Sequence, residues 1–211
     1  MANIQIFGAP QSTFVRVVRM ACEEKGVPYD LVPVRPHSPE INAIHPFGKI
    51  PGMRHGAVEL CESKAIATYI DKSFGGPKLI PDDPAAAAQV EQWVSLINTL
   101  YEPVWVRDYL LSYFFPGTPD GSPNRAAIEK ALPDMRKQAE ILNRAVAGTG
   151  YLAGGAFSLA DMYLLPILDY VRKLPEAAEI MKANPSLEAY CARHAERPCV
   201  KATIPPPPPG R

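Results

Sequence analysis

Two short stretches of the sequence carry groups that could bind a small peptide. Residues 9–13 (APQST) place Ser12, with its hydroxyl, at the predicted start of a helix. In residues 45–53 (HPFGKIPGM), Pro51 comes just before a predicted short strand, so we predict a cis Ile50–Pro51 bond. That turn would leave the amide and carbonyl of Ile50 facing outward. An extended peptide could pair with them.

A third stretch, Glu62-Ser63, lies where a predicted strand ends and a predicted helix begins. Backbone amides and the Ser63 hydroxyl could hold a carboxylate there, while Glu62 could pair with an ammonium group. This corner therefore offers a receptor for an amino-acid head group. Each group also has a purely structural interpretation. Ser12 could be only a helix N-cap, Thr13 could replace it as the hydroxyl donor, and Glu62 and Lys49 could be solvated surface charges.

The elements that must position these residues follow from apolar spacing and turn signals. The first part predicts a strand at 4–7, a helix at 13–25 ended by Gly26, and a strand at 27–34 that Pro33 confines to a sheet edge. After a loop at 35–48 with at most one helical turn come hairpin strands at 52–54 and 58–61 and a helix at 63–74. Beyond the proline-rich segment 77–84 the pattern is helical, at 85–115, 125–147, 159–174 and 185–197. A capping box opens the third of these helices at Ser158 and Asp161. The sequence predicts an α/β region followed by an all-α region.

Composition excludes several classes of partner and site. The 22 Lys+Arg balance the 22 Asp+Glu, so no broad field favours nucleic acid or an acidic membrane. No apolar run approaches the roughly 20 residues that cross a bilayer, and no signal peptide is recognisable, so we expect a cytoplasmic protein. The four cysteines form no CxxC pair and the histidines have no metal spacing. We expect reduced thiols, no bound metal, and an exposed His194.

These motifs together resemble the cytosolic glutathione S-transferases. The resemblance rests on 9–13 with Arg16, on 46–51, on 62–66, and on 158–161 with Pro166, in the family's order along the chain. It is strongest to the phi-like and related bacterial members that use serine. The resemblance implies a thioredoxin-like α/β domain at 1–76, a linker at 77–84, an all-helical domain at 85–200 and a proline-rich tail at 201–211. We expect the tail, with Pro205 to Pro209, to be a polyproline II segment.

The resemblance also implies roles for the candidate residues. Ser12 would donate its hydroxyl to the thiolate of glutathione, which serves as co-substrate. Arg16, one turn further on, could add positive potential or could be a structural ion-pair partner. The remaining glutathione contacts would come from His37, Lys49, Ile50, Pro51, Glu62 and Ser63. Family members specialised for thiol transfer place a cysteine where this chain has Ser12, which disfavours that reaction here.

An aromatic stripe could serve the second substrate. From Tyr101 it continues at intervals of four through Trp105, Tyr109 and Tyr113, and then Phe114. In an α-helix such a stripe drifts by about 40° per step, so it would wrap around the helix. It could be core packing, or its carboxyl-terminal part could line an apolar cleft.

The resulting prediction is a homodimeric transferase that conjugates glutathione to apolar electrophiles. The alternatives are a glutathione-dependent peroxidase and a non-catalytic ligand-binding protein of the same fold.

Overall fold

The computed structural model of this chain describes residues 3–206, which form two compact units. One unit contains residues up to 81 together with those from 195 onward, and the other contains 82–194. The first is a thioredoxin-like α/β unit and the second is helical, as predicted. Among the described residues, no helix is both long enough and apolar enough to cross a membrane.

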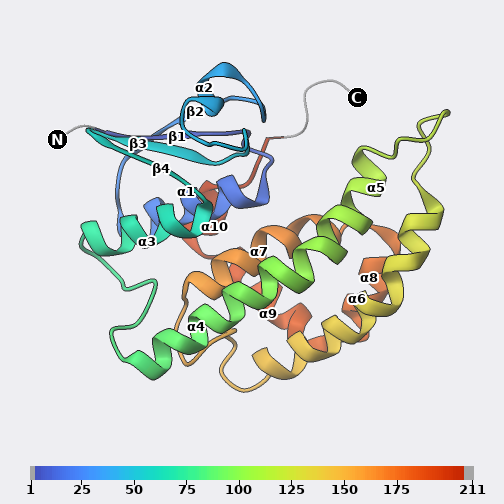
Figure 1. The fold of residues 1–211 in the computed structure, drawn as a ribbon. Coiled ribbons are helices and arrows are strands. Elements are labelled where there is room, and N and C mark those ends of the chain that lie inside the picture. The colour runs from blue at the N-terminus through green and yellow to red at the C-terminus, as the bar shows by residue number, and fades with distance from the viewer. Residues whose placement is uncertain (1–2, 207–211) are drawn as a thin grey trace. The chain divides into compact units, whose positions relative to one another are not determined.

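A four-stranded sheet forms the centre of the first unit (Figure 1). Its strands β1 (Ile4–Phe7), β2 (Tyr29–Val32), β3 (Gly52–His55) and β4 (Val58–Cys61) lie in the order β2-β1-β3-β4. Strand β2 is parallel to β1, and the other pairs are antiparallel. The edge position predicted for the second strand is confirmed, and Pro33 follows directly after it.

Helices cover both faces of this sheet. Figure 1 shows α1 (Thr13–Lys25) and α3 (Ser63–Ser73) on one face and the short α2 (Pro39–Asn42) on the other. Helix α1 buries Val15, Val18 and Cys22, the apolar positions whose spacing predicted it. It ends at Gly26, whose left-handed φ of 65° lets its N–H reach the carbonyls of the last turn.

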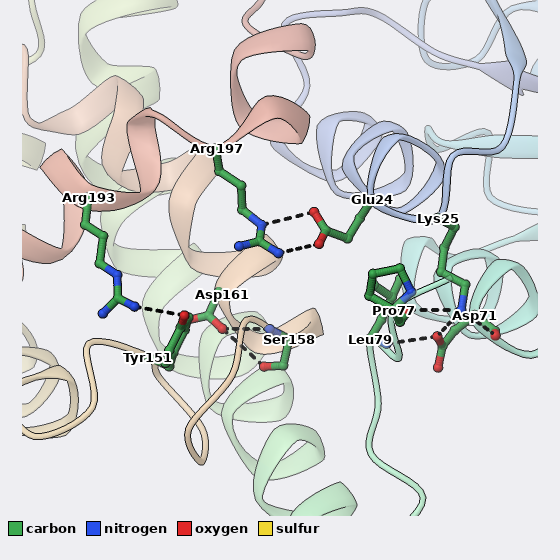
Figure 2. Close-up of polar contacts among 10 residues, drawn as sticks. All are labelled: Glu24, Lys25, Asp71, Pro77, Leu79, Tyr151, Ser158, Asp161, Arg193 and Arg197. Atoms are coloured by element: carbon green, nitrogen blue, oxygen red, sulfur yellow. Dashed lines mark hydrogen bonds and ion pairs between the residues drawn. The ribbon is translucent and has the colours of Figure 1, made fainter. Parts of the chain in front are cut away.

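Helix α10 (Pro198–Ala202), which the sequence did not predict, packs against α1 in the same unit. Arg197 forms a two-pronged ion pair with Glu24 at the start of α10 (Figure 2). At its other end the buried Arg16 donates to the Val200 carbonyl over 3.2 Å and to Thr203 Oγ1 over 3.3 Å. Arg16 therefore helps to hold α10 against α1.

The predicted polyproline tail can be followed only in part. Pro205 and Pro206 belong to no helix or strand, and Pro207 to Pro209 lie outside the described residues. The side-chain amide of Gln11 donates to the Pro206 carbonyl over 3.4 Å.

A buried ion pair holds the segment after α3. Lys25 Nζ lies 3.0 Å from Asp71 Oδ1, and the two side chains are 1% and 4% exposed. Lys25 also donates to the carbonyls of Asp71 and Pro77, while the Asp71 carboxylate accepts the Leu79 amide (Figure 2). The same carboxylate accepts the Ile80 amide. Residues 77–80 of the predicted linker are thus held against α1 and α3.

The second unit is built around a buried helix, α7 (Leu159–Val171), which is apolar over most of its surface. The predicted capping box is present, because the Ser158 amide donates to Asp161 Oδ2 over 2.9 Å (Figure 2). The other elements of the unit are α4 (Pro84–Leu96), η1 (Ile97–Leu110), α5 (Leu111–Phe114), α6 (Arg125–Val146), α8 (Pro175–Lys182) and α9 (Pro185–Ala195). Helix α8 was not predicted.

The helix that carries the aromatic stripe is wider than predicted. Figure 1 shows α4, η1 and α5 as one continuous helix, of which η1 has the π-type i→i+5 hydrogen-bond pattern. Tyr101, Trp105 and Tyr109 are all buried. The expectation of a regular α-helix was wrong for this part of the chain.

Candidate active site

The register of the sheet brings the three predicted binding stretches to one place. Phe7 at the end of β1 lies opposite Gly52 at the start of β3, and Gly52 lies opposite Cys61 at the end of β4. The residues that follow Phe7, precede Gly52 and follow Cys61 must therefore meet at the same end of the sheet. These segments contain Ser12, Ile50-Pro51 and Glu62-Ser63, respectively.

Ser12 is the N-cap of α1, with its hydroxyl oxygen accepting the Val15 amide over 3.3 Å. A hydroxyl has one proton to donate and two lone pairs to accept with, so the cap leaves its proton available for a second partner. The first turn of α1 contains no acidic residue, so nothing there cancels the positive end of the helix dipole. Thr13, the rival donor, is buried, whereas Ser12 is half-exposed.

Close packing at Gly8 places the Ser12 turn against Ile50. A methyl group at Gly8 would come within 2.4 Å of Val15 Cγ2 and 3.3 Å of Ile50 Cβ. The Ile50–Pro51 bond is cis, as predicted. Among the described residues, the backbone of Ile50 has no backbone hydrogen-bond partner. Its amide and carbonyl are thus open for an extended peptide.

Glu62 and Ser63 form the turn from β4 into α3. Glu62 has a φ of 69°, which L-residues other than glycine, Asn and Asp seldom adopt, and its side chain is 71% exposed. Ser63 is buried and is the first residue of α3. Unusual backbone conformations of this kind concentrate at ligand-binding sites. The turn therefore presents the Glu62 carboxylate to solvent and places the Ser63 hydroxyl at the start of α3.

His37 and Lys49 lie on the neighbouring loop, and both are exposed. His37 also has a positive φ, 63°, and its amide donates to the Gly48 carbonyl over 2.8 Å. A methyl group at Gly48 would come within 2.4 Å of His37 Nδ1, so the imidazole rests on this glycine next to Lys49. In the described part of the chain, His37 and Glu62 are the two residues other than glycine with positive φ.

Comparison with known proteins agrees with this geometry. The sequence profile of the glutathione S-transferase N-terminal domain matches residues 6–78, and that of the glutathione S-transferase C-terminal domain matches residues 106–198. Glutathione S-transferase 3 of Zea mays is 32% identical over 225 aligned residues, which cover 99% of this chain and 98% of the relative. The chain belongs to the glutathione S-transferase family.

Solved structures of the family share the fold. Glutathione transferase F7 from Populus trichocarpa has a TM-score of 0.86 at 29% identity, with 95% of this chain and 97% of that chain covered. A glutathione S-transferase I from maize, in complex with an atrazine glutathione conjugate, has a TM-score of 0.85 at 26% identity, with 96% of both chains covered. The protein is a glutathione transferase that uses glutathione as co-substrate.

The aromatic residues expected to bind the second substrate fall into two groups in this transferase. Trp105 and Tyr109 are fully buried, with the Trp105 ring N–H donating to Gln138 Oε1 over 2.7 Å. Packing occupies both side chains, which is the structural alternative that the sequence left open. Tyr113 and Phe114, which follow the wide part of the helix, are half-exposed.

Polar contacts fix Tyr113 within the second unit. Its hydroxyl donates to Glu176 Oε2 over 2.5 Å, and Arg125 Nη2 lies 2.7 Å from Glu176 Oε1. Partial burial by itself would raise the pKa of Glu176, but the hydrogen bonds from Tyr113 and Arg125 outweigh it and lower that pKa to about 2. The carboxylate stays ionised at neutral pH and keeps Tyr113 in place, so the sequence missed Glu176 as the anchor of this aromatic group.

Three of the protein's four thiols are poor nucleophiles. Burial raises the pKa of the thiols of Cys22, Cys191 and Cys199 to about 12, and Cys61 is half-exposed. In residues 3–206, no group of three or more His, Cys, Asp or Glu side chains is arranged to hold a metal ion.

His45 is a further residue of the site, to which the sequence assigned no role. It is 3% exposed, its Nδ1 accepts the Phe47 amide over 3.1 Å, and its Nε2 lies 3.5 Å from Glu62 Oε1. It thus joins the loop before β3 to the turn after β4. These residues are 17 positions apart, as 62 − 45 gives, so no local spacing pattern could have indicated the contact.

Proposed function

We propose that this glutathione transferase holds glutathione as a thiolate against Ser12 and transfers the sulfur to apolar electrophiles. The observation that carries the proposal is the position of the Ser12 hydroxyl. It caps α1 through its oxygen, keeps its proton, and lies at the sheet end where Ile50 and Glu62-Ser63 also converge.

The energy needed for this step is within reach of the groups present. An unperturbed thiol has a pKa of about 8.5, and lowering it to about 6.5 requires about 2.7 kcal/mol in favour of the thiolate. A hydrogen bond to a charged acceptor contributes about 1.5–3 kcal/mol. The amino terminus of a helix adds about 0.3–1 kcal/mol. Ser12 need not ionise, so no neighbouring base is required.

The other glutathione contacts follow from the chemistry of each group. The backbone of Ile50, before the cis Pro51, pairs with the cysteinyl residue. The Glu62 carboxylate takes the ammonium of the γ-glutamyl group, and Ser63 with the α3 amino terminus takes its carboxylate. Lys49 and His37, exposed on the adjoining loop, meet the glycyl end.

For the apolar substrate, the accessible candidates are Tyr113 and Phe114, because Trp105 and Tyr109 are enclosed in the core. Phe114→Ala should raise the Michaelis constant for apolar electrophiles and leave that for glutathione unchanged. Trp105→Phe is the matched control, since it keeps an aromatic ring in the core. If Phe114→Ala is indistinguishable from the wild type with every apolar electrophile, the second-substrate assignment fails.

We also infer a homodimer in the cytoplasm. The support for a dimer is Phe47, whose ring is 73% exposed on the loop before β3 while His45 fixes its amide. Phe47→Ser should shift the protein towards monomer in light scattering, whereas Phe47→Tyr, which keeps a ring, should not. A wild-type monomer at all concentrations would refute the dimer. The four free cysteines support a reducing compartment, which cell fractionation can test.

Retention on immobilised glutathione, followed by a conjugation assay with an aromatic electrophile, tests the main proposal. We expect retention, elution by free glutathione and turnover. Ser12→Ala should be retained but should lose most turnover. Loss of turnover in Thr13→Val with an unaffected Ser12→Ala would move the role to Thr13.

A further inference from the structure

The environment of His45 fixes the position of its proton. A backbone N–H can only donate, so the 3.1 Å contact from the Phe47 amide makes His45 Nδ1 an acceptor. The neutral ring then carries its proton on Nε2. That atom lies 3.5 Å from Glu62 Oε1, at the margin of direct contact. The buried imidazole therefore presents an N–H dipole to the exposed carboxylate.

The Glu62 carboxylate needs such a partner because its exposed side chain can adopt several orientations. Its side chain is 71% exposed and has three rotatable bonds, and it stands at a turn with a φ of 69° rather than inside a helix or strand. Ordering an exposed side chain on ligand binding costs about 0.5–1.5 kcal/mol. A ring that is 3% exposed is already immobile, so it can restrict the carboxylate before the ligand arrives.

We propose that His45 is a positioning residue that orients the Glu62 carboxylate towards the ammonium group of glutathione. The inference rests on the proposed role of Glu62 in binding that ammonium. His45 does not touch the ligand in this account. Its Nδ1 holds the loop through Phe47, and its Nε2 sets the orientation of the carboxylate.

The two nitrogens can be tested separately. In His45→Asn, the side-chain oxygen can replace Nδ1 as acceptor of the Phe47 amide. The asparagine side chain is too short to place a donor near Glu62, where Nε2 stood. In His45→Gln, the side-chain amide nitrogen can replace Nε2 and still approach Glu62. If His45 only holds the loop, His45→Asn should behave like the wild type. If it orients Glu62, His45→Gln should be the milder change.

The experiment compares glutathione with glutaryl-cysteinylglycine, which is glutathione without its α-amino group. For His45→Asn we expect the Michaelis constant for glutathione to rise about two- to fivefold, the range of an exposed ion-pair contact, at unchanged kcat. The constant for the analogue should stay unchanged. His45→Gln should restore most of the affinity for glutathione. In a Glu62→Gln background, His45→Asn should have no further effect.

Two results would overturn the inference, and a third would overturn the proposed function instead. If His45→Asn weakens both ligands equally, or neither, His45 does not act through Glu62. If Glu62→Gln leaves the preference for glutathione over the analogue intact, the role of Glu62 itself is wrong. If His45→Asn does not fold, NMR of the wild-type protein labelled with 15N-histidine still tests the inference. Its His45 Nε2–H signal should shift with glutathione and not with the analogue, and equal shifts would refute the inference.

Discussion

Replacing Asp71 by Asn should destabilise the first unit by about 3–5 kcal/mol, the cost of leaving a buried charge without its partner. Lys25 is 1% exposed, and its ammonium has three acceptors, namely Asp71 Oδ1, the Asp71 carbonyl and the Pro77 carbonyl. The substitution keeps the shape of the side chain and removes the negative charge. The ammonium would then be held only by neutral oxygens.

The hydrogen bonds of Asp71 add a smaller cost. Oδ1 faces both Lys25 and the Leu79 amide, so the new amide group must replace Oδ2, which accepts the Ile80 amide over 3.2 Å. Two donors would then face each other, and an unpaired buried donor costs about 1–3 kcal/mol. Removing the stranded charge as well should recover stability, so Lys25→Met/Asp71→Asn should be more stable than Asp71→Asn alone.

Urea unfolding followed by far-UV circular dichroism measures these differences. The matched control is Lys182→Met, because Lys182 and Glu179 form an ion pair of similar length with both side chains about two-thirds exposed. That substitution should leave the unfolding free energy unchanged within error. The reasoning fails if Asp71→Asn lies within about 1 kcal/mol of the wild type, a cost typical of an exposed pair. It also fails if the double variant is the less stable one.

Two further predictions concern ionisation. The pKa of Glu176 falls from 4.5 to about 2 on folding, so its ionised form contributes stability above pH 4.5 that is lost as the pH falls towards 2. Glu176→Gln should therefore be less stable than the wild type at neutral pH, and the gap in urea unfolding should close in acid; a gap independent of pH would contradict this. In the native protein, a thiol-specific chromogenic reagent should modify Cys61 fast and the other three cysteines only on unfolding, because burial raises their thiol pKa to about 12. Fast modification of more than one thiol per chain would refute it.

The first unit could be predicted from the sequence because its signals are local. Gly26 ends α1 and Pro33 follows an edge strand. The hairpin turn lies at Gly56 and Ala57, one residue later than predicted, because His55 is still paired with Val58 in the sheet. Once the register is known, the convergence of Ser12, Ile50 and Glu62 follows from it. The candidate site is therefore mostly a consequence of short-range pattern.

The missed helices have one physical cause. The predicted helices end at 174 and 197, and no helix was predicted to start at the prolines that follow. Proline is favoured at the first position of a helix, where its missing N–H would be unpaired anyway. Helices α8 and α10 both begin with proline, as do α2, α4 and α9. Five of the 24 prolines therefore mark helix starts rather than loops.

Long-range contacts account for the remaining errors. His194 was predicted to be exposed, but it is buried and its Nε2 contacts the Gly150 carbonyl over 2.8 Å. Its partner is 44 residues away, and so its burial depends on how helices pack rather than on local spacing. The contact of His45 with Glu62 is of the same kind, because it joins residues that are distant in the sequence.

The central claim is that the Ser12 hydroxyl stabilises the thiolate of bound glutathione, and the pKa of that thiol measures it most directly. Ultraviolet difference titration of the glutathione complex records thiolate formation in the wild type and in Ser12→Ala. The account predicts that Ser12→Ala binds glutathione with similar affinity and that its bound thiol titrates about one to two units higher, the equivalent of a charged hydrogen bond. An unchanged thiol pKa in a Ser12→Ala variant that still binds glutathione would contradict it.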